Sequence, residues 1–184
     1  MDTIRLEEKT VTQDYRYRGR IVNLRVDEAE LPDGKSALRE VVEHSGGVCV
    51  AALNERNELL FVRQYRYPYG EITLELPAGK LERGEEPDLA IRRELLEETG
   101  AVGGAYLFLG NLYPTPGYCD ENIRLYATRI ERMAAPNPDE DEFLTVESIP
   151  LAEAVKLVME NKIPDAKTQV LILKTERLIA SGAL

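Results

Sequence analysis

The chain has 184 residues, of which 43% are hydrophobic and 30% are charged, and its formal net charge is −10. This length fits one domain, or one domain with a small appendage, and the composition is that of a folded globular protein. The acidic balance argues against a protein that binds nucleic acid or anionic membrane surfaces, because both partners need a basic footprint.

The cysteine content and the chain start give little sign of secretion. Cys49 and Cys119 do not make a disulfide framework, and neither has a metal-ligand spacing to His44, the single histidine. The first ten residues have no apolar stretch of the signal-peptide kind, and the apolar run at residues 48–53 is too short to cross a bilayer. We therefore expect a cytoplasmic protein.

The first 45 residues alternate between apolar and polar side chains, which predicts strands and no helix. The expected strands are residues 3–12, 21–31 and 37–44. A Leu-Pro-Asp-Gly-Lys turn at residues 31–35 separates the last two. Three amphipathic strands cannot cover both faces of their own sheet, so this module at residues 1–45 should pack on the rest of the chain or on a second copy.

Residues 46–184 mix strands with helices and form the predicted main domain. We expect strands at residues 47–54, 58–66, 72–77, 105–113, 122–130 and 143–149. We expect one helix from Pro87, which suits a first helical position, to the residue before Gly100, and two more at residues 151–162 and 166–180. The predicted class is α+β: a mixed β-sheet sandwiched between helices and preceded by an N-terminal antiparallel β module.

Three glutamates, Glu94, Glu97 and Glu98, lie at positions i, i+3 and i+4 of the first helix and therefore share one face. Their mutual repulsion destabilises the helix unless a hard, oxygen-seeking cation such as Mg²⁺ binds them, and the negative end of the helix dipole favours that cation. Arg93 precedes Glu97 by four residues and can hold its side chain. Taken alone, such a trio is more often a solvated acidic helix face.

The spacing around these glutamates is much more specific than the trio itself. The fixed positions are Gly79, Glu85, Arg93, Glu94, Leu95, Glu97, Glu98 and Gly100. This pattern resembles the signature of the Nudix hydrolases, and only Ala101 departs from it, where the family prefers a larger aliphatic residue. The glycine allows the backbone at residues 77–79 to approach a metal or a phosphate closely.

The resemblance implies how the motif works. Glu94 and Glu98 would be direct metal ligands, Glu97 a ligand or the group that orients the attacking water, and the carbonyl of Ala78 a further oxygen ligand. Arg93 would belong to the catalytic group through its contact with Glu97. Bound Mg²⁺, with Mn²⁺ as a substitute, would neutralise phosphate charge and activate water for the cleavage of a diphosphate.

Most of the chain resembles one branch of this family, the ADP-ribose pyrophosphatases. Pro116 lies 16 residues beyond Gly100, and the segments at residues 62–68, 115–121 and 138–142 are similar to motifs of that branch. The implied reaction is Mg²⁺-dependent hydrolysis of ADP-ribose to AMP and ribose 5-phosphate. Two alternatives stay open: hydrolysis of another nucleoside diphosphate sugar such as GDP-mannose, and a nucleotide sensor without turnover, against which the complete glutamate set argues.

The same resemblance implies the substrate contacts. Arg66 and Arg63 would contact the phosphates, although a surface salt bridge is the alternative for each. Residues that would line the terminal ribose side are Glu82, Thr115, Gly117 and Glu121, and Pro116 would be a further substrate-binding residue. Glu40 would reach the nucleoside end from a partner subunit.

The resemblance also implies a general base and an assembly. The base would be Glu142 or Glu140, with a slight preference for Glu142, in a loop that swings over the diphosphate. The N-terminal strands would be exchanged in a homodimer, so that the substrate site spans both chains.

Overall fold

The computed structural model of the protein describes residues 6–137 and 143–184. Its contacts divide the chain into two units. The first contains Met1–Gly46 and Thr115–Glu121, and the second contains Gly47–Pro114 and Asn122–Leu184. Thr115–Glu121 thus groups with the N-terminal strands, whereas the sequence-based division placed this segment in the main domain.

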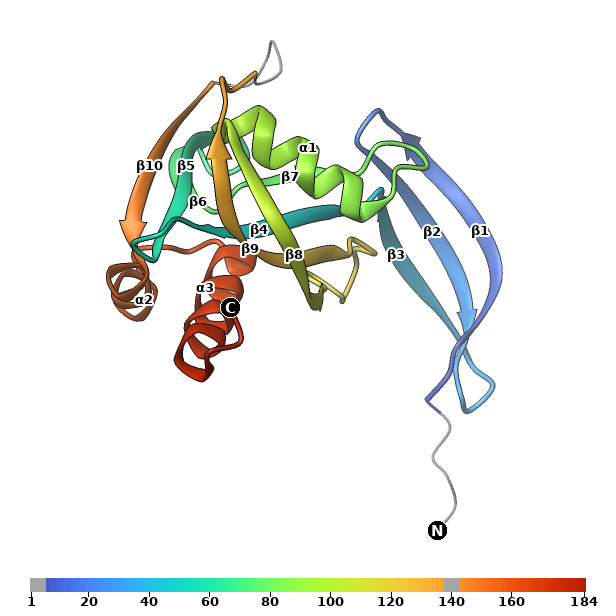
Figure 1. Ribbon diagram of the computed structural model, residues 1–184. Coiled ribbons are helices and arrows are strands. Elements are labelled where there is room, and N and C mark those ends of the chain that lie inside the picture. The colour runs from blue at the N-terminus through green and yellow to red at the C-terminus, as the bar shows by residue number, and fades with distance from the viewer. Residues whose placement is uncertain (1–5, 138–142) are drawn as a thin grey trace. The chain divides into compact units, whose positions relative to one another are not determined.

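The first unit contains a three-stranded antiparallel sheet in the order β1-β2-β3 (Figure 1). The strands are β1 (Lys9–Arg18), β2 (Val22–Glu30) and β3 (Ser36–His44). The predicted turn between the last two forms with Gly34 at a φ of +84°, a value that glycine adopts without strain. The Thr115–Glu121 segment lies along β3, where the Val42 N–H donates to the Tyr118 carbonyl (2.7 Å) and the Asp120 N–H donates to the Val42 carbonyl (3.1 Å).

The first strand lies about six residues later than expected. It starts at Lys9 instead of residue 3, and nearly all its side chains are exposed. An exposed strand has no buried face, so the alternation of apolar and polar residues contains little information on where pairing begins.

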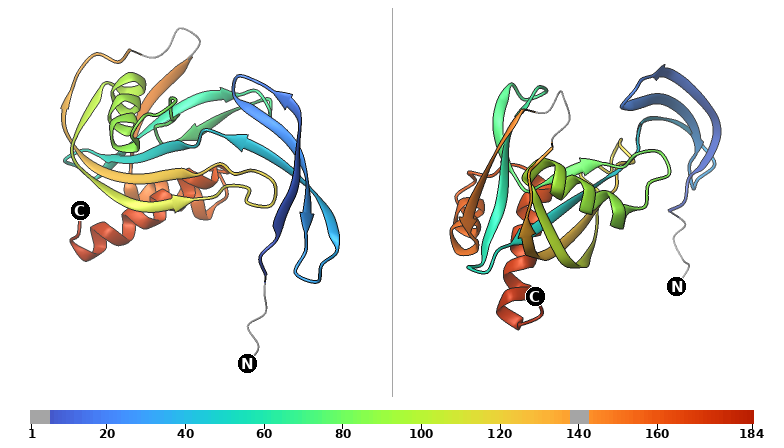
Figure 2. Two further views of the ribbon diagram at one scale, coloured as in Figure 1. Left: turned by 90° about the vertical axis from the view of Figure 1, so that its right-hand side faces the viewer. Right: turned by 45° about the horizontal axis from the view of Figure 1, so that its top comes forward.

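The second unit is built on a seven-stranded mixed sheet (Figure 2). Its strands are β4 (Gly47–Leu53), β5 (Glu58–Arg66), β6 (Glu71–Glu75), β7 (Ala78–Lys80), β8 (Ala101–Leu112), β9 (Ile123–Met133) and β10 (Leu144–Pro150). The main order is β10-β5-β4-β9-β8, while β6 pairs with β5 and β7 pairs with β4. Among the described residues of this sheet, only the β4–β9 strand pair is parallel.

Helices cover both faces of this sheet, with α1 (Pro87–Thr99) on one face and α2 (Leu151–Met159) and α3 (Ala166–Ser181) on the other (Figure 1). The side chains of β4 alternate between the two layers because successive residues of a strand point to opposite faces. The layer under α1 contains Val48, Val50, Ala52, Ala90, Ile91 and Leu95. The layer under α2 and α3 contains Cys49, Ala51, Leu53, Ala154, Leu171 and Ile172. The predicted α+β class, with a mixed sheet between helices, is confirmed.

The end of α1 is set by Gly100, as predicted. This glycine has a φ of +73°, and its N–H donates to the Leu96 carbonyl at 2.8 Å. A Cβ atom at this position would lie 2.3 Å from the Ala134 carbonyl oxygen, so no side chain fits. None of the helices in the described ranges is long and apolar enough to cross a membrane.

Candidate active site

The backbone at residues 77–79 is held between the central strand β4 and helix α1. The Val50 N–H of β4 donates to the Pro77 carbonyl (3.0 Å), and Ala78 pairs with Cys49. From the other side, the Ala78 N–H donates to Oε2 of Glu98 at 3.0 Å. The segment is therefore fixed against the glutamate-bearing face of α1.

Gly79 lies so close to Glu94 that it cannot carry a side chain without displacing it. A Cβ atom at Gly79 would stand 1.8–2.2 Å from the carboxyl atoms of Glu94. The side chains of Glu94 and Glu98 are buried, with residue exposures of 7% and 2%. These two carboxylates are thus enclosed by the Gly79 loop and do not belong to a solvated helix face.

Arg93 connects the loop before α1 to the carboxylates on the helix. Its Nη1 donates to Glu94 Oε1 and to Glu97 Oε2, both at 2.9 Å. Its Nε and Nη2 form a bidentate pair with Glu85, also at 2.9 Å. These bonds lower the pKa of Glu85 and raise the pKa of Arg93. The expected contact with Glu97 is present, and the arginine also orients Glu94 and the loop.

The donor set fits a hard divalent cation. Glu94, Glu97, Glu98 and the backbone carbonyl of Ala78 offer oxygen atoms only, which Mg²⁺ prefers. The loop approaches the helix at Gly79 as closely as the absence of a Cβ atom allows, so backbone and carboxylates come together. Among the residues that the structure describes, no three Asp, Glu, His or Cys side chains are placed to hold one metal ion together. Two of the α1 glutamates are hydrogen-bonded to Arg93 instead.

Arg66 lies at the end of β5 and belongs to a cluster of charged and polar side chains, which we call the Glu75 cluster. Its members are Arg66, Thr73, Glu75, Asp165 and Lys167. Nε and Nη2 of Arg66 donate to the two oxygens of Glu75, each at 2.6 Å. Lys167 forms ion pairs with Glu75 and with Asp165, the residue that caps the start of α3. The hydrogen bonds to Glu75 are the main cause of the raised pKa of Arg66, against the opposing effect of burial, and the charges of Glu75, Asp165 and Glu98 add to it.

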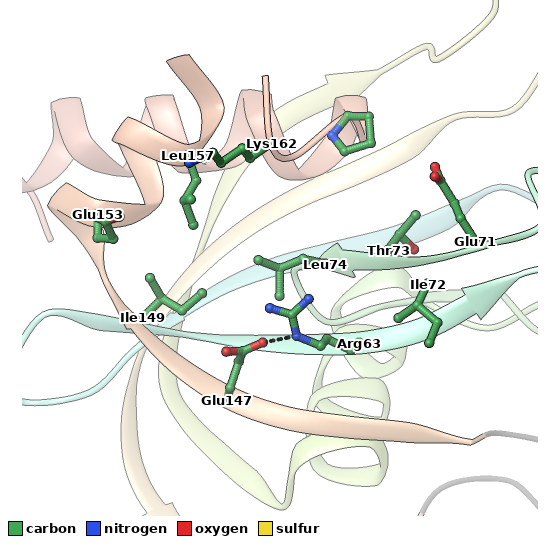
Figure 3. A pocket seen from close by; sticks show the side chains of 11 residues that line it. Arg63, Glu71, Ile72, Thr73, Leu74, Glu147, Ile149, Glu153, Leu157 and Lys162 are labelled. Carbon is green, nitrogen blue, oxygen red and sulfur yellow. Dashed lines mark hydrogen bonds and ion pairs between the residues drawn. The ribbon is translucent and has the colours of Figure 1, made fainter. Parts of the chain in front are cut away.

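Arg63 lies on the other side of the sheet. It follows Phe61 by two residues on β5, and Phe61 packs in the layer under α2 and α3. Arg63 forms an ion pair with Glu147 of β10, and both residues line a cleft of about 520 Å³ beside α2 (Figure 3). Its predicted contact with substrate phosphates stays a prediction.

The predicted substrate residues of the first unit gather partly around one cleft of about 320 Å³. Glu40, Pro116 and Gly117 line it. Glu121 directly follows the cleft-lining segment in the sequence, and its Oε1 lies 3.4 Å from Nδ1 of His44. The carbonyl of Thr115 accepts from the N–H groups of the next turn, at Tyr118 and Cys119.

The remaining predicted residues are Glu82, Glu140 and Glu142. Glu82 is exposed, and its N–H donates to Glu85 Oε2 at 3.0 Å, so it belongs to the loop that Arg93 holds. Glu140 and Glu142 lie outside the residues that the structure describes.

Comparison with protein families decides the identity of the fold and the motif. The NUDIX domain matches residues 43–170, and the nucleoside diphosphate sugar hydrolase N-terminal domain matches residues 8–42. The chain belongs to the Nudix family. The glutamate-bearing helix and the Gly79 loop are therefore the signature of a diphosphohydrolase, and enzymes of this family use divalent metal ions.

Relatives of this Nudix hydrolase cover between 73% and 90% of its length. A protein of Bacillus methanolicus named methanol dehydrogenase activator is 40% identical over 90% of this chain and 91% of its own. An ADP-ribose pyrophosphatase of Bacillus subtilis is 39% identical over 89% of both chains. A GDP-mannose pyrophosphatase of Cronobacter sakazakii is 33% identical over 73% of this chain and 75% of its own.

Sequence reasoning missed the partners of Arg66. Glu75 is only 2% exposed, although it sits in a strand that looks like a purely structural one. Lys167 reaches it from α3, which begins 91 residues later in the chain. An acidic residue inside the apolar run of residues 72–77 was the one available signal, because a buried carboxylate requires a cationic partner.

The Glu75 cluster should make the stability of this Nudix hydrolase depend on acid pH. Burial alone raises the pKa of Glu75, but hydrogen bonds from Arg66 and the charge of Lys167 outweigh it and lower the pKa from 4.5 to about 2. A depressed pKa stabilises the fold above the unfolded value of 4.5, and the effect is lost as pH falls towards 2.

We therefore expect the difference in unfolding free energy between the wild type and Glu75→Gln to shrink by about 2 kcal/mol between pH 5 and pH 3. Urea unfolding at both pH values measures this difference, and subtraction removes the carboxylates that the two proteins share. A difference that does not change with pH would contradict the assignment.

Proposed function

We propose that this Nudix hydrolase cleaves ADP-ribose to AMP and ribose 5-phosphate in a reaction that requires Mg²⁺, for which Mn²⁺ can substitute. The observation that carries the substrate is the ADP-ribose pyrophosphatase of Bacillus subtilis, which aligns with this chain over 89% of both lengths. The chemistry is supported by the complete glutamate set on α1, which the Gly79 loop encloses.

In this proposal the buried carboxylates hold the cations. Glu94 and Glu98, with the carbonyl of Ala78, would be the direct ligands, and Glu97 a further ligand or the group that orients water. Bound cations would neutralise the diphosphate and favour attack by water. Arg93 holds Glu94 and Glu97 in place and anchors Glu85, so that helix and loop keep one geometry.

Arg66 would contact the diphosphate. Its pair with Glu75 uses Nε and Nη2, which leaves the Nη1 edge of the guanidinium for a phosphate oxygen. Its side chain is 38% exposed, so a ligand can reach it.

The other substrate contacts rest on the likeness to relatives. The terminal ribose side would be lined by Glu82, Thr115, Gly117 and Glu121, and Pro116 would also contact the substrate. Glu40 would reach the nucleoside end from the partner in a homodimer with exchanged N-terminal strands. Glu142 or Glu140 would serve as the general base. If light scattering shows a monomer at the concentrations of the assay and this monomer is fully active, the substrate site is not shared between two chains.

The second candidate is hydrolysis of another nucleoside diphosphate sugar. It is favoured by the Cronobacter sakazakii relative, which is named GDP-mannose pyrophosphatase. Its shorter alignment, over 73% of this chain against 89% for the ADP-ribose pyrophosphatase, makes it the weaker candidate. A sensor without turnover is disfavoured because no glutamate of the signature is missing.

A substrate panel with product analysis tests the proposal. With Mg²⁺, we expect kcat/KM for ADP-ribose to exceed that for GDP-mannose by at least about tenfold, and chromatography to show AMP and ribose 5-phosphate in equal amounts. Reactions in chelator give the metal-free control. A preference for GDP-mannose would select the second candidate, and binding of both nucleotides without turnover would select the sensor.

A further inference from the structure

The Glu75 cluster contains a carboxylate whose two oxygens are both fully engaged. Oε1 of Glu75 accepts from Nε of Arg66 and from Oγ1 of Thr73, each at 2.6 Å. Oε2 accepts from Nη2 of Arg66 at 2.6 Å and from Nζ of Lys167. Four hydrogen-bond donors fix the buried carboxylate of Glu75 in one orientation. The bidentate pair then fixes the orientation of the Arg66 guanidinium.

We propose that Glu75 is a positioning residue of this enzyme: it holds the Arg66 guanidinium ready for the substrate diphosphate, and Lys167 holds Glu75 in turn. This inference rests on the proposed function, in which Arg66 contacts the diphosphate. Glu75 itself would not touch the substrate, because it is 2% exposed and lies behind the arginine.

Two physical effects follow from this arrangement. An arginine side chain has several rotatable bonds, and ordering them before the substrate arrives removes an entropy cost from binding. Lys167 fixes the second oxygen of Glu75, and since the charges of Arg66 and Lys167 balance those of Glu75 and Asp165, its effect is on the orientation of the carboxylate and not on net charge. Asp165, which caps α3, fixes the ammonium group of Lys167 at 2.9 Å from the far side.

The structure offers a matched control on the same strand. Arg63 and Arg66 are both on β5, and each forms an ion pair with one glutamate: Glu147 for Arg63 and Glu75 for Arg66. The first pair lines the cleft beside α2, on the opposite side of the sheet from α1 (Figure 3). Glu75→Gln and Glu147→Gln therefore make the same chemical change behind two different arginines.

A double-mutant cycle with ADP-ribose and Mg²⁺ tests the inference. We expect Glu75→Gln to raise KM about tenfold, with kcat changed less than about threefold, since charge-assisted hydrogen bonds are lost and the chemistry at α1 is untouched. Glu147→Gln should change KM less than Glu75→Gln does, because both side chains of the Arg63–Glu147 pair are exposed and solvent screens it, whereas Glu75 is buried. In the Arg66→Met background, where KM is already raised, Glu75→Gln should change KM no further.

The contrary results are equally specific. An unchanged KM in folded Glu75→Gln, an unchanged KM in Arg66→Met, or additive effects in the double variant would overturn the positioning role. If melting curves show that Glu75→Gln does not fold, Lys167→Met takes its place, with about a threefold rise in KM expected only while Arg66 is present. If the wild type does not hydrolyse ADP-ribose, the proposed substrate is wrong and the positioning role is still open to test. The same double-mutant cycle is then measured with GDP-mannose, which also contains a diphosphate.

Discussion

Glu98→Gln should lower kcat for ADP-ribose by at least about a thousandfold while the protein stays folded, because in the proposed site Glu98 is a metal ligand and the substitution removes its charge. Glu98 is almost completely buried on the inner face of α1, and its Oε2 accepts the Ala78 N–H. A glutamine has the same shape, and its carbonyl oxygen can accept the same bond. The loss of activity should therefore come from charge and not from collapse of the loop.

The stability of this variant gives a second, opposite readout. Removing one of three like charges on a single helix face relieves repulsion, so the metal-free variant should melt at the wild-type temperature or above it. Glu86→Gln is the matched control, since Glu86 precedes the same helix and makes no capping bond with its side chain. Normal turnover by Glu98→Gln would refute the metal assignment, and a large loss in Glu86→Gln would show that the assay reports helix stability.

Gly79→Ala should lower kcat/KM by about a hundredfold with little loss of stability, since displacing a reacting group by about an ångström has effects of this size. The new Cβ atom would stand 1.8–2.2 Å from the Glu94 carboxyl group, which must then move. Glu94 is held there by Arg93 at 2.9 Å, but the end of its side chain can rotate away. The substitution thus separates the position of the carboxylate from the integrity of the fold.

Gly84→Asn is the control for this change, because it adds a side chain to the turn between β7 and α1. Gly84 has a φ of +80°, which asparagine tolerates, and nothing lies within 4 Å of its Cβ position. Thermal melting and steady-state kinetics on both variants check the pair. Equal activity of Gly79→Ala and the wild type would mean that Glu94 is not needed where the structure places it.

The fold was largely predictable from local sequence signals, and each error of the prediction has a physical cause. Pro87 and Gly100 define α1 because one suits a helix start and the other a left-handed end. The central strand β4 and the first half of β5 were recognisable because they are buried and apolar. β1 was predicted at the wrong position because an exposed strand has no apolar face. The short strand β7 was missed because three residues are too few to show an alternation of apolar and polar side chains.

The candidate site was predictable only where its residues lie close together in the chain. The α1 glutamates, Arg93 and Gly79 fall within one motif, and the resemblance of that motif to the Nudix signature implies their chemistry. The Glu75 cluster joins β5, β6 and α3, and no local pattern encodes a contact across 92 residues. The side of the sheet on which Arg63 points was likewise unknown until the alternation of β5 could be fixed by its packing.

The central claim, that the buried glutamates of α1 bind divalent cations, is tested most directly by Mn²⁺ titration followed by electron paramagnetic resonance. Free Mn²⁺ gives a signal that disappears when the ion binds, so the measurement does not depend on turnover. We predict that the wild type binds at least one Mn²⁺ per chain and that Glu98→Gln loses this binding. Equal Mn²⁺ binding by the two proteins would contradict the account.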